Sequence, residues 1–152
     1  MATHLKKIVI VFCVFAIGIV IGGYLFSDTQ PRSVLSLQNC SRCLSPSELL
    51  GLMASVGIQH ASGLIPSGVK ETDKTIAVKS PAPQARIHFL ILPKKDIKDV
   101  GNISPEDAEY VTDMMQVIAS LIQENKLDGY KIISNGPDIQ QLNYLHFHLI
   151  AD

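Results

Sequence analysis

The chain has 152 residues, 47% of them hydrophobic and 6% aromatic, so it is long enough for one domain and too apolar to be a disordered tail. Its 13 basic and 14 acidic residues give a formal charge of −1, which argues against a nucleic-acid partner bound by neutralising its phosphates. Three cysteines are too few for a small domain held together mainly by disulfides.

The first predicted element is an apolar helix. The nineteen residues from Ile8 to Phe26 carry no charged or strongly polar side chain, and at about 1.5 Å per residue they cover roughly 28 Å, close to the hydrocarbon core of a bilayer. Lys6 and Lys7 precede this run, and only Arg32 is basic in the dozen residues that follow it. The positive-inside rule therefore predicts a single-pass protein whose C-terminal domain is extracytoplasmic, and periplasmic in a bacterium.

A cleaved signal peptide is the alternative interpretation of this helix. The apolar region of a signal peptide is usually about 7–15 residues long and is followed by an A-x-A-like cleavage site. No such site follows Phe26, and Cys13 lies in the middle of the apolar run. We therefore expect residues 1–26 to be an uncleaved membrane anchor.

Residues 27–56 are expected to form a stalk and a short helix. The first part of this segment is rich in Ser, Gln and Asn and contains Pro31. Ser45-Pro46-Ser47-Glu48 is a capping box with proline at the first helical position, which predicts a helix that runs to about Ser55. Gly57 is expected to interrupt regular structure.

Two strands and a long helix come next. Thr75–Lys79 predicts a short strand and Arg86–Leu92 a stronger one, which Pro93 ends. Ser104 is a helix N-cap followed by proline, and we expect the helix to end near Lys126. Its apolar residues recur at helical spacing and predict a face buried in the core: Tyr110, Val111, Met114, Val117, Ile118, Leu121 and Ile122.

The last predicted strands are Tyr130–Ser134 and, after a turn at Asn135-Gly136, Leu142–Ala151. Because side chains alternate along a strand, the final strand has an apolar face and a face with two imidazoles and a phenol. The apolar face comprises Leu145, Phe147 and Leu149, and the other face Tyr144, His146 and His148. Short strands around one long helix indicate an α+β fold with an antiparallel sheet.

Three interpretations of His146 and His148 follow from the residues alone. Two imidazoles side by side are half a metal site, although no carboxylate lies near them in the sequence. They are also compatible with partly buried polar residues at the end of a sheet. The third interpretation is catalysis, since a neutral imidazole attacks phosphorus or an acyl carbon while a neighbouring group stabilises the leaving group.

The order of motifs over residues 57–150 resembles that of the histidine-triad (HIT) superfamily of nucleotide hydrolases and transferases. The family pattern is a strand H-φ-φ-φ-φ-P-K, a helix, a strand that ends at Asn, a loop with Gln, and a strand H-φ-H-φ-H. The residues that match it are His88, Pro93, Lys94, Asn135, Gln140, His146 and His148. Gly63-Leu64-Ile65-Pro66 is similar to the family's G-E-I-P segment. The resemblance implies a HIT-like antiparallel sheet with one long and one short helix over residues 57–152.

The resemblance also implies a covalent mechanism. His146 takes the position of the family's nucleophile, which attacks an α-phosphate to form a nucleotidyl-imidazole that water then resolves. His148 takes the third triad position and would help to place the phosphate and the leaving group. Asn135, Gln140 and Gln141 would bind the substrate around its phosphate oxygens. A turn residue is the alternative interpretation of Asn135, and a solvated loop that of the two glutamines.

The triad departs from the family pattern at its first position, where Tyr144 replaces histidine. A tyrosine there can keep a hydrogen bond between strands without the reactivity of an imidazole. Two function classes follow: a HIT-like nucleotide phosphohydrolase or nucleotidyl transferase, or a non-catalytic nucleotide-binding module with a decayed triad. Within the enzyme class, a hydrolase of lipid-linked nucleotides like CDP-diacylglycerol pyrophosphatase is the alternative, because that enzyme is also membrane-anchored and faces outward.

Cys40 and Cys43 have the C-x2-C spacing of half a zinc site. Some HIT proteins bind zinc through two such cysteines, the histidine at the position of His88, and the first triad histidine, which is Tyr144 here. Outside the cytosol a local disulfide is the competing interpretation, and we favour disulfide or free thiols over zinc. We expect no required cofactor, and homodimer formation through the long helix, as in many HIT proteins, stays open.

Overall fold

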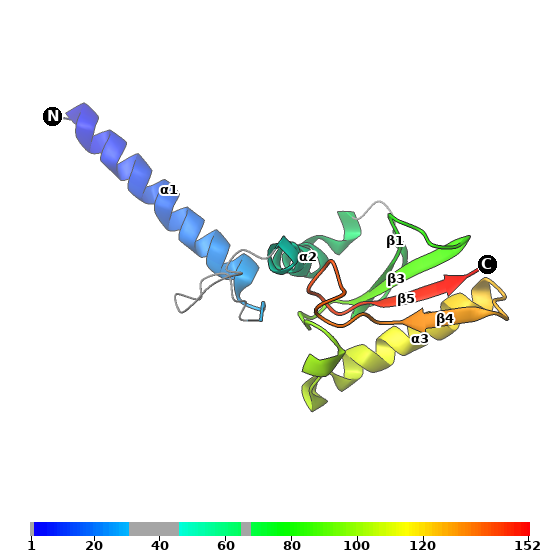
Figure 1. Ribbon diagram of the computed structural model, residues 1–152. Helices are drawn as coiled ribbons and strands as arrows, with labels where there is room; N and C mark the ends of the chain where they lie inside the picture. Colours follow the sequence, from blue (N-terminus) through cyan, green and yellow to red (C-terminus); the bar gives the residue numbers. More distant parts are fainter. Residues whose placement is uncertain (1, 31–45, 65–67) are drawn as a thin grey trace.

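The computed structural model describes residues 2–30, 46–64 and 68–152. A long N-terminal helix, α1 (Ala2–Phe26), precedes an α+β domain that contains a five-stranded sheet, α2 (Pro46–Ala61) and α3 (Ala108–Glu124) (Figure 1). Three short 3-10 turns complete it: η2 (Ser62–Leu64), η3 (Val100–Asn102) and η4 (Pro105–Asp107). The expected fold class, an antiparallel sheet with helices after an apolar N-terminal helix, is confirmed.

The sheet has the strand order β1-β2-β3-β5-β4, and all neighbouring strands are antiparallel. Its members are β1 (Gly68–Glu71), β2 (Thr75–Lys79), β3 (Ile87–Pro93), β4 (Tyr130–Ile133) and β5 (Phe147–Ala151). The last strand of the chain therefore lies between β3 and β4. In this register His148 is opposite Leu90 on one side and Ile133 on the other.

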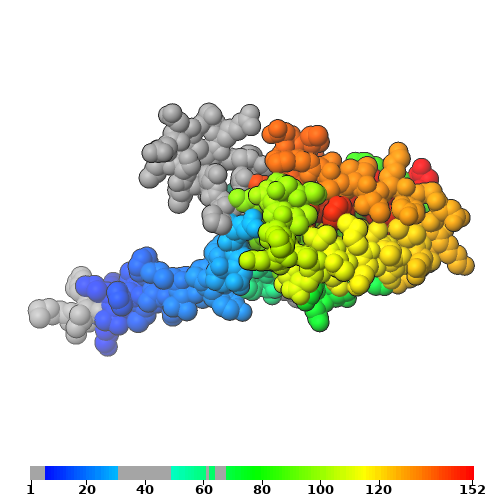
Figure 2. Space-filling view, turned by 90° about the horizontal axis from the view of Figure 1, so that it is seen from below, coloured from blue at the N-terminus to red at the C-terminus, as the bar shows by residue number. Residues whose placement is uncertain are grey.

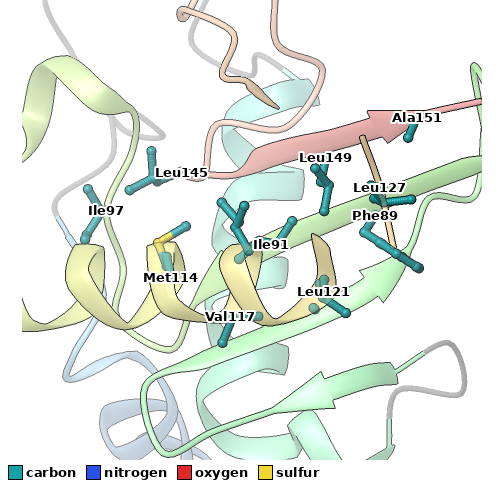
Figure 3. Packing of buried hydrophobic residues seen from close by; sticks show 12 residues of the cluster. Phe89, Ile91, Ile97, Met114, Val117, Leu121, Leu127, Leu145, Leu149 and Ala151 are labelled. Atoms are coloured by element: carbon teal, nitrogen blue, oxygen red, sulfur yellow. The ribbon is translucent and has the colours of Figure 1, made fainter. Parts of the chain in front are cut away.

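Helix α3 covers one face of the sheet and forms the larger core with it (Figure 3). The buried side chains of this core come from three strands, from α3 and from the adjoining loops: Ala77, Phe89, Ile91, Leu149, Ala151, Met114, Val117, Ile118, Leu121, Ile97, Leu127 and Leu145. The apolar face predicted for the long helix is thus the face that packs on the sheet. This packing leaves the alternate residues of β3 and β5 on the opposite face.

A smaller core lies on the opposite face, beneath α2. Ile58 from α2 packs there with Tyr144 and with apolar side chains of the neighbouring strands, Ile76, Val78 and Leu92. The helix predicted to end near Ser55 therefore continues to Ala61 and runs through Gly57, because burial of Ile58 stabilises its last turns. The helix therefore crosses position 57, the expected boundary between stalk and domain.

Two strands also differ from the sequence prediction. The short strand β1 was not predicted, because its residues Gly68–Glu71 show little apolar character. The last strand begins at Phe147 and not at Leu142. The segment before Phe147 does not join the sheet, since the Leu145 N–H donates to the carbonyl of Ile97 in a loop.

Helix α1 extends away from the domain (Figure 2). Its residues Lys6–Phe26 are long and apolar enough to cross a membrane by length and composition, and their large side chains are exposed. The C-terminal end of α1 meets α2, where the rings of Tyr24 and His60 lie 5.2 Å apart. Just after α1, the backbone N–H of Gln30 donates to the Asp96 carboxylate at 2.8 Å.

Candidate functional site

Three imidazoles gather on the face of the sheet opposite α3. His88 comes from β3 and His148 from β5, while His146 directly precedes β5. The ring of His148 lies 5.1 Å from that of His88 and 4.9 Å from that of His146. His88 and His146 are only 5% and 7% exposed, and His148 is half-buried. His146 was expected to point away from the core, and it does leave the α3 core, but it is buried nevertheless.

The hydrogen bond of His146 defines which of its nitrogens can react. Its Nδ1 lies 2.7 Å from the backbone carbonyl oxygen of Tyr144. A carbonyl oxygen can only accept, so Nδ1 carries the proton and donates it. In the neutral ring the lone pair is then on Nε2. This is the protonation state that a nucleophilic imidazole needs.

His88 and His148 share a hydrogen bond whose direction follows from the neighbouring groups. The backbone N–H of Gln84 donates to His88 Nδ1 at 3.1 Å, so this nitrogen has no proton. The proton of a neutral His88 is therefore on Nε2, which lies 2.9 Å from His148 Nδ1 and donates to it. His148 must then carry its own proton on Nε2. The relay from Gln84 through His88 fixes the tautomer of His148.

Asn135 lies next to the Nε2–H group of His148. Its side-chain nitrogen is 3.5 Å from His148 Nε2. Because the Nε2 of His148 is a donor, it needs an acceptor, and the carbonyl oxygen of Asn135 takes this place after a half-turn of the amide. Asn135 follows β4, which pairs with β5, so the sheet brings together Asn135, His146 and His148 as the sequence predicts.

The two glutamines occupy different environments. Gln140 is buried, and its side-chain nitrogen donates to the Lys98 carbonyl at 3.3 Å and to Asn143 Oδ1 at 3.1 Å. Its amide nitrogen therefore holds the loop before β5 in place. Gln141 is exposed on the same loop.

Tyr144 is completely buried in the smaller core. Its hydroxyl lies 2.6 Å from the carbonyl oxygen of Pro93 and 3.0 Å from that of Lys95, and its one proton is shared between these acceptors. The side chain thus makes a hydrogen bond at the end of β3. A tyrosine in place of the first triad histidine was expected to keep such a bond. Its backbone carbonyl meanwhile orients His146.

Sequence reasoning missed the role of His88. The sequence motif placed His88 on the predicted strand and at a possible zinc-ligand position, whereas the structure makes it the hydrogen-bond partner of His148. The signal was present in the motif order, but the contact depends on the register between β3 and β5. That register places His88 opposite Ile150, two residues from His148.

A groove of about 650 Å³ is lined by residues of β4, by the end of β5 and by Gln84, whose N–H donates to His88. Side chains next to His88 and His148 in the sheet line it, among them Gln84, Lys131, Ile133 and Ile150. The groove combines apolar walls with a cationic side chain.

Burial makes His88 and His148 weaker bases than a free imidazole. Burial, together with the positive charges that His146 and His88 would carry, lowers the pKa of His148 from its usual 6.5 to about 4. Burial also lowers the pKa of His88. Both rings are therefore neutral at physiological pH, as the hydrogen-bond relay requires.

The stability of the protein should fall on acidification between pH 6.5 and about 4. In this range the unfolded chain protonates His148 while the folded chain does not, so the stabilisation present above pH 6.5 is lost as the pH falls. Urea unfolding at neutral pH and at about pH 5 measures this loss. A His148→Gln variant should show a smaller difference between the two conditions. An equal difference in both proteins would contradict the lowered pKa.

Comparison with known proteins identifies the family of this domain. Residues 60–152 match the family model described as scavenger mRNA decapping enzyme C-term binding. An uncharacterized HIT-like protein of Helicobacter pylori is 32% identical over 93 residues, which cover 59% of this chain and 88% of the relative. The chain belongs to the histidine-triad (HIT) superfamily. A HIT-like protein of Chlamydia pneumoniae is 34% identical over 86 residues, which cover 55% of this chain and 78% of the relative.

Solved HIT structures share the fold of this domain. A histidine triad protein from Clostridium difficile has a TM-score of 0.58 at 31% identity, covering 66% of this chain and 91% of that one. A HIT family hydrolase from Legionella pneumophila has a TM-score of 0.57 at 29% identity, and the match covers 62% of this chain and 88% of that one. The chain therefore carries a HIT-type nucleotide-binding or hydrolase module.

Proposed function

We propose that the HIT domain is a nucleotide phosphohydrolase or nucleotidyl transferase whose nucleophile is His146. The observation that carries this proposal is the hydrogen bond from His146 Nδ1 to the Tyr144 carbonyl, which leaves the lone pair on Nε2. This is the tautomer that a nucleophilic imidazole uses, and it supports the enzyme class over the non-catalytic module. The oriented carbonyl also stabilises the positive charge that the ring gains when it attacks.

The reaction has two steps. His146 Nε2 forms a bond to the α-phosphorus, and the bond from phosphorus to the leaving group breaks with its electron pair, which takes up a proton from solvent. Water or another acceptor then attacks the phosphorus of the nucleotidyl-imidazole, losing a proton and releasing His146 with its lone pair restored. Splitting one difficult displacement into two easier ones is the advantage of covalent catalysis.

The other site residues would act on the phosphate. In this proposal the Nε2–H of His148 donates a hydrogen bond to a phosphate or leaving-group oxygen, with Asn135 beside it. Gln141 would reach the phosphate from its exposed loop, and Gln140 would act by holding that loop. Such donors stabilise the transition state because they are oriented before the substrate binds.

The experiment is to offer the full chain nucleoside phosphoramidates, dinucleotides and CDP-linked lipids. We expect release of a nucleoside monophosphate from at least one class, and mass spectrometry of the acid-sensitive intermediate should place the nucleotidyl group on His146. Nucleotide binding without turnover of any substrate would refute the enzyme and leave the second class, a non-catalytic binding module. Turnover confined to CDP-linked lipids would identify a lipid-nucleotide hydrolase.

We also propose that α1 anchors the HIT domain outside the cytosol. The apolar stretch Lys6–Phe26, with its two lysines at the N-terminal end, supports this orientation. The domain would then be periplasmic in a bacterium. Protease added to intact cells with a permeabilised outer layer should digest the domain, and protection of the domain would contradict this orientation.

The residues that the structure describes do not fit the zinc site of some HIT proteins. Nε2 of His88 is hydrogen-bonded to His148. The Tyr144 hydroxyl is hydrogen-bonded to the carbonyls of Pro93 and Lys95. Cys40 and Cys43 lie outside the described residues. We propose that no zinc or other cofactor is required, and metal analysis that finds stoichiometric zinc in the purified chain would overturn this.

Homodimer formation is a separate proposal. β4 lies at the edge of the sheet, and it exposes the apolar side chains of Tyr130, Ile132 and Ile133. Met115 is exposed on α3. Light scattering of the purified protein in detergent should report the mass of two chains, and the mass of one chain would refute pairing.

A further inference from the structure

Helix α2 is apolar on two opposite sides. From Leu49 to Gln59 its sequence contains no charged residue. One side is buried against the domain through Ser55 and Ile58, yet Leu49 and Met53 on the other side are 46% and 65% exposed. A helix that is hydrophobic all round is normally covered on every side. We therefore expect another surface to cover the exposed side of α2.

The exposed side of α2 is the side that faces the end of α1. Residues four and seven positions apart share one side of a helix, so Leu49, Met53 and His60 lie on the same side. The ring of His60 contacts that of Tyr24, two residues before the end of α1. Figure 1 shows α2 nearly end-on and α1 along its length, so the axes of the two helices cross.

This geometry favours a lipid surface as the occupant. A helix that crosses the end of a membrane-spanning helix lies along the surface of the membrane. The exposed side of α2 continues the exposed apolar surface of α1, whose large side chains are uncovered up to Phe26. A second copy of the chain could cover Leu49 and Met53 as well, but the continuity with α1 favours lipid.

We propose that α2 lies in the interface of the bilayer that α1 spans, with Leu49 and Met53 immersed at the boundary between headgroups and acyl chains. This inference rests on the proposed anchoring by α1. It goes further, because a single anchor would leave the domain free to swing, whereas an immersed α2 fixes its orientation. The Gln30 N–H bond to Asp96 supplies a second attachment beside the anchor.

The orientation also concerns the substrate. α2 packs through Ile58 on the cluster that contains Tyr144, and the Tyr144 carbonyl holds His146. An immersed α2 would therefore hold the imidazole site next to the membrane surface. Such a site favours nucleotides concentrated in that surface by an apolar group, since tethering both reactants raises their effective concentration.

The test uses the full chain with Cys13→Ser, Cys40→Ser and Cys43→Ser, which allows one introduced cysteine to carry an environment-sensitive fluorophore. The label is placed at Met53→Cys, and the protein is reconstituted into vesicles of phosphatidylcholine and phosphatidylglycerol. We expect blue-shifted emission that nitroxide-labelled lipids quench several-fold and aqueous iodide quenches little. A label at Gln116→Cys, on the exposed side of α3, is the matched control and should respond only to iodide.

A third label, at Phe15→Cys within α1, separates this inference from the anchor. If the label at position 15 is quenched by nitroxide lipids while that at position 53 is quenched by iodide, the anchor stands and the immersion of α2 is refuted. If iodide quenches both labels, both proposals fail. A label at position 53 that neither quencher reaches would show that protein covers α2, which also overturns the inference.

Discussion

His146→Ala should reduce turnover by roughly a thousandfold or more, because it removes the atom that forms the covalent bond to phosphorus. His148→Ala should cost less, roughly ten- to a hundredfold, since it removes one hydrogen bond to the transition state and leaves the nucleophile. Initial rates of nucleoside monophosphate release measure both effects. Gln116→Ala, on the exposed side of α3, is the matched control and should leave the rate unchanged.

The loss in His146→Ala has to be separated from unfolding, because His146 is buried and its Nδ1–H satisfies the Tyr144 carbonyl. Circular dichroism and a thermal melt should show a folded protein of somewhat reduced stability. A folded His146→Ala protein that binds nucleotide normally but forms no intermediate supports the proposed role. One that retains most of the wild-type rate would exclude His146 as the nucleophile.

The fold was predictable to the extent that local patterns encode it. The spacing of Met114, Val117 and Leu121 predicted the helix face that packs on the sheet, and the alternation around Leu149 predicted its buried side. The motif order likewise predicted that His146, His148 and Asn135 would meet. These features depend on residues close together in the sequence or on the order of whole elements.

The contacts that were not predicted depend on pairing between distant segments. His88 and His148 are sixty positions apart, and only the register of β3 against β5 brings their rings within hydrogen-bond distance. The burial of Gln140 likewise depends on a carbonyl forty-two positions away. The end of α2 was misplaced because Gly57 weakens a helix locally, whereas packing of Ile58 stabilises it.

Tyr144 is the position where sequence alone left two outcomes, a working replacement or a partial loss, and the structure shows a packing role for its side chain. Its ring fills the smaller core, and its hydroxyl satisfies the buried carbonyls after β3. Tyr144→His should therefore lower the free energy of unfolding by about 2 kcal/mol or more, since the smaller ring leaves a cavity and loses these bonds. The rate should be unchanged or lower, because a shift of the backbone would move the carbonyl that orients His146.

Tyr144→Phe separates the hydroxyl from the ring. It keeps most of the volume but leaves the Pro93 and Lys95 carbonyls without the hydroxyl donor, which should cost about 1–3 kcal/mol in urea unfolding. Its rate should stay near that of the wild type if the carbonyl of residue 144 alone orients His146. A Tyr144→His protein that is both faster and equally stable would mean that the triad has decayed from three histidines. A slower, less stable one would support a role for the packing of Tyr144 in holding the carbonyl that orients His146.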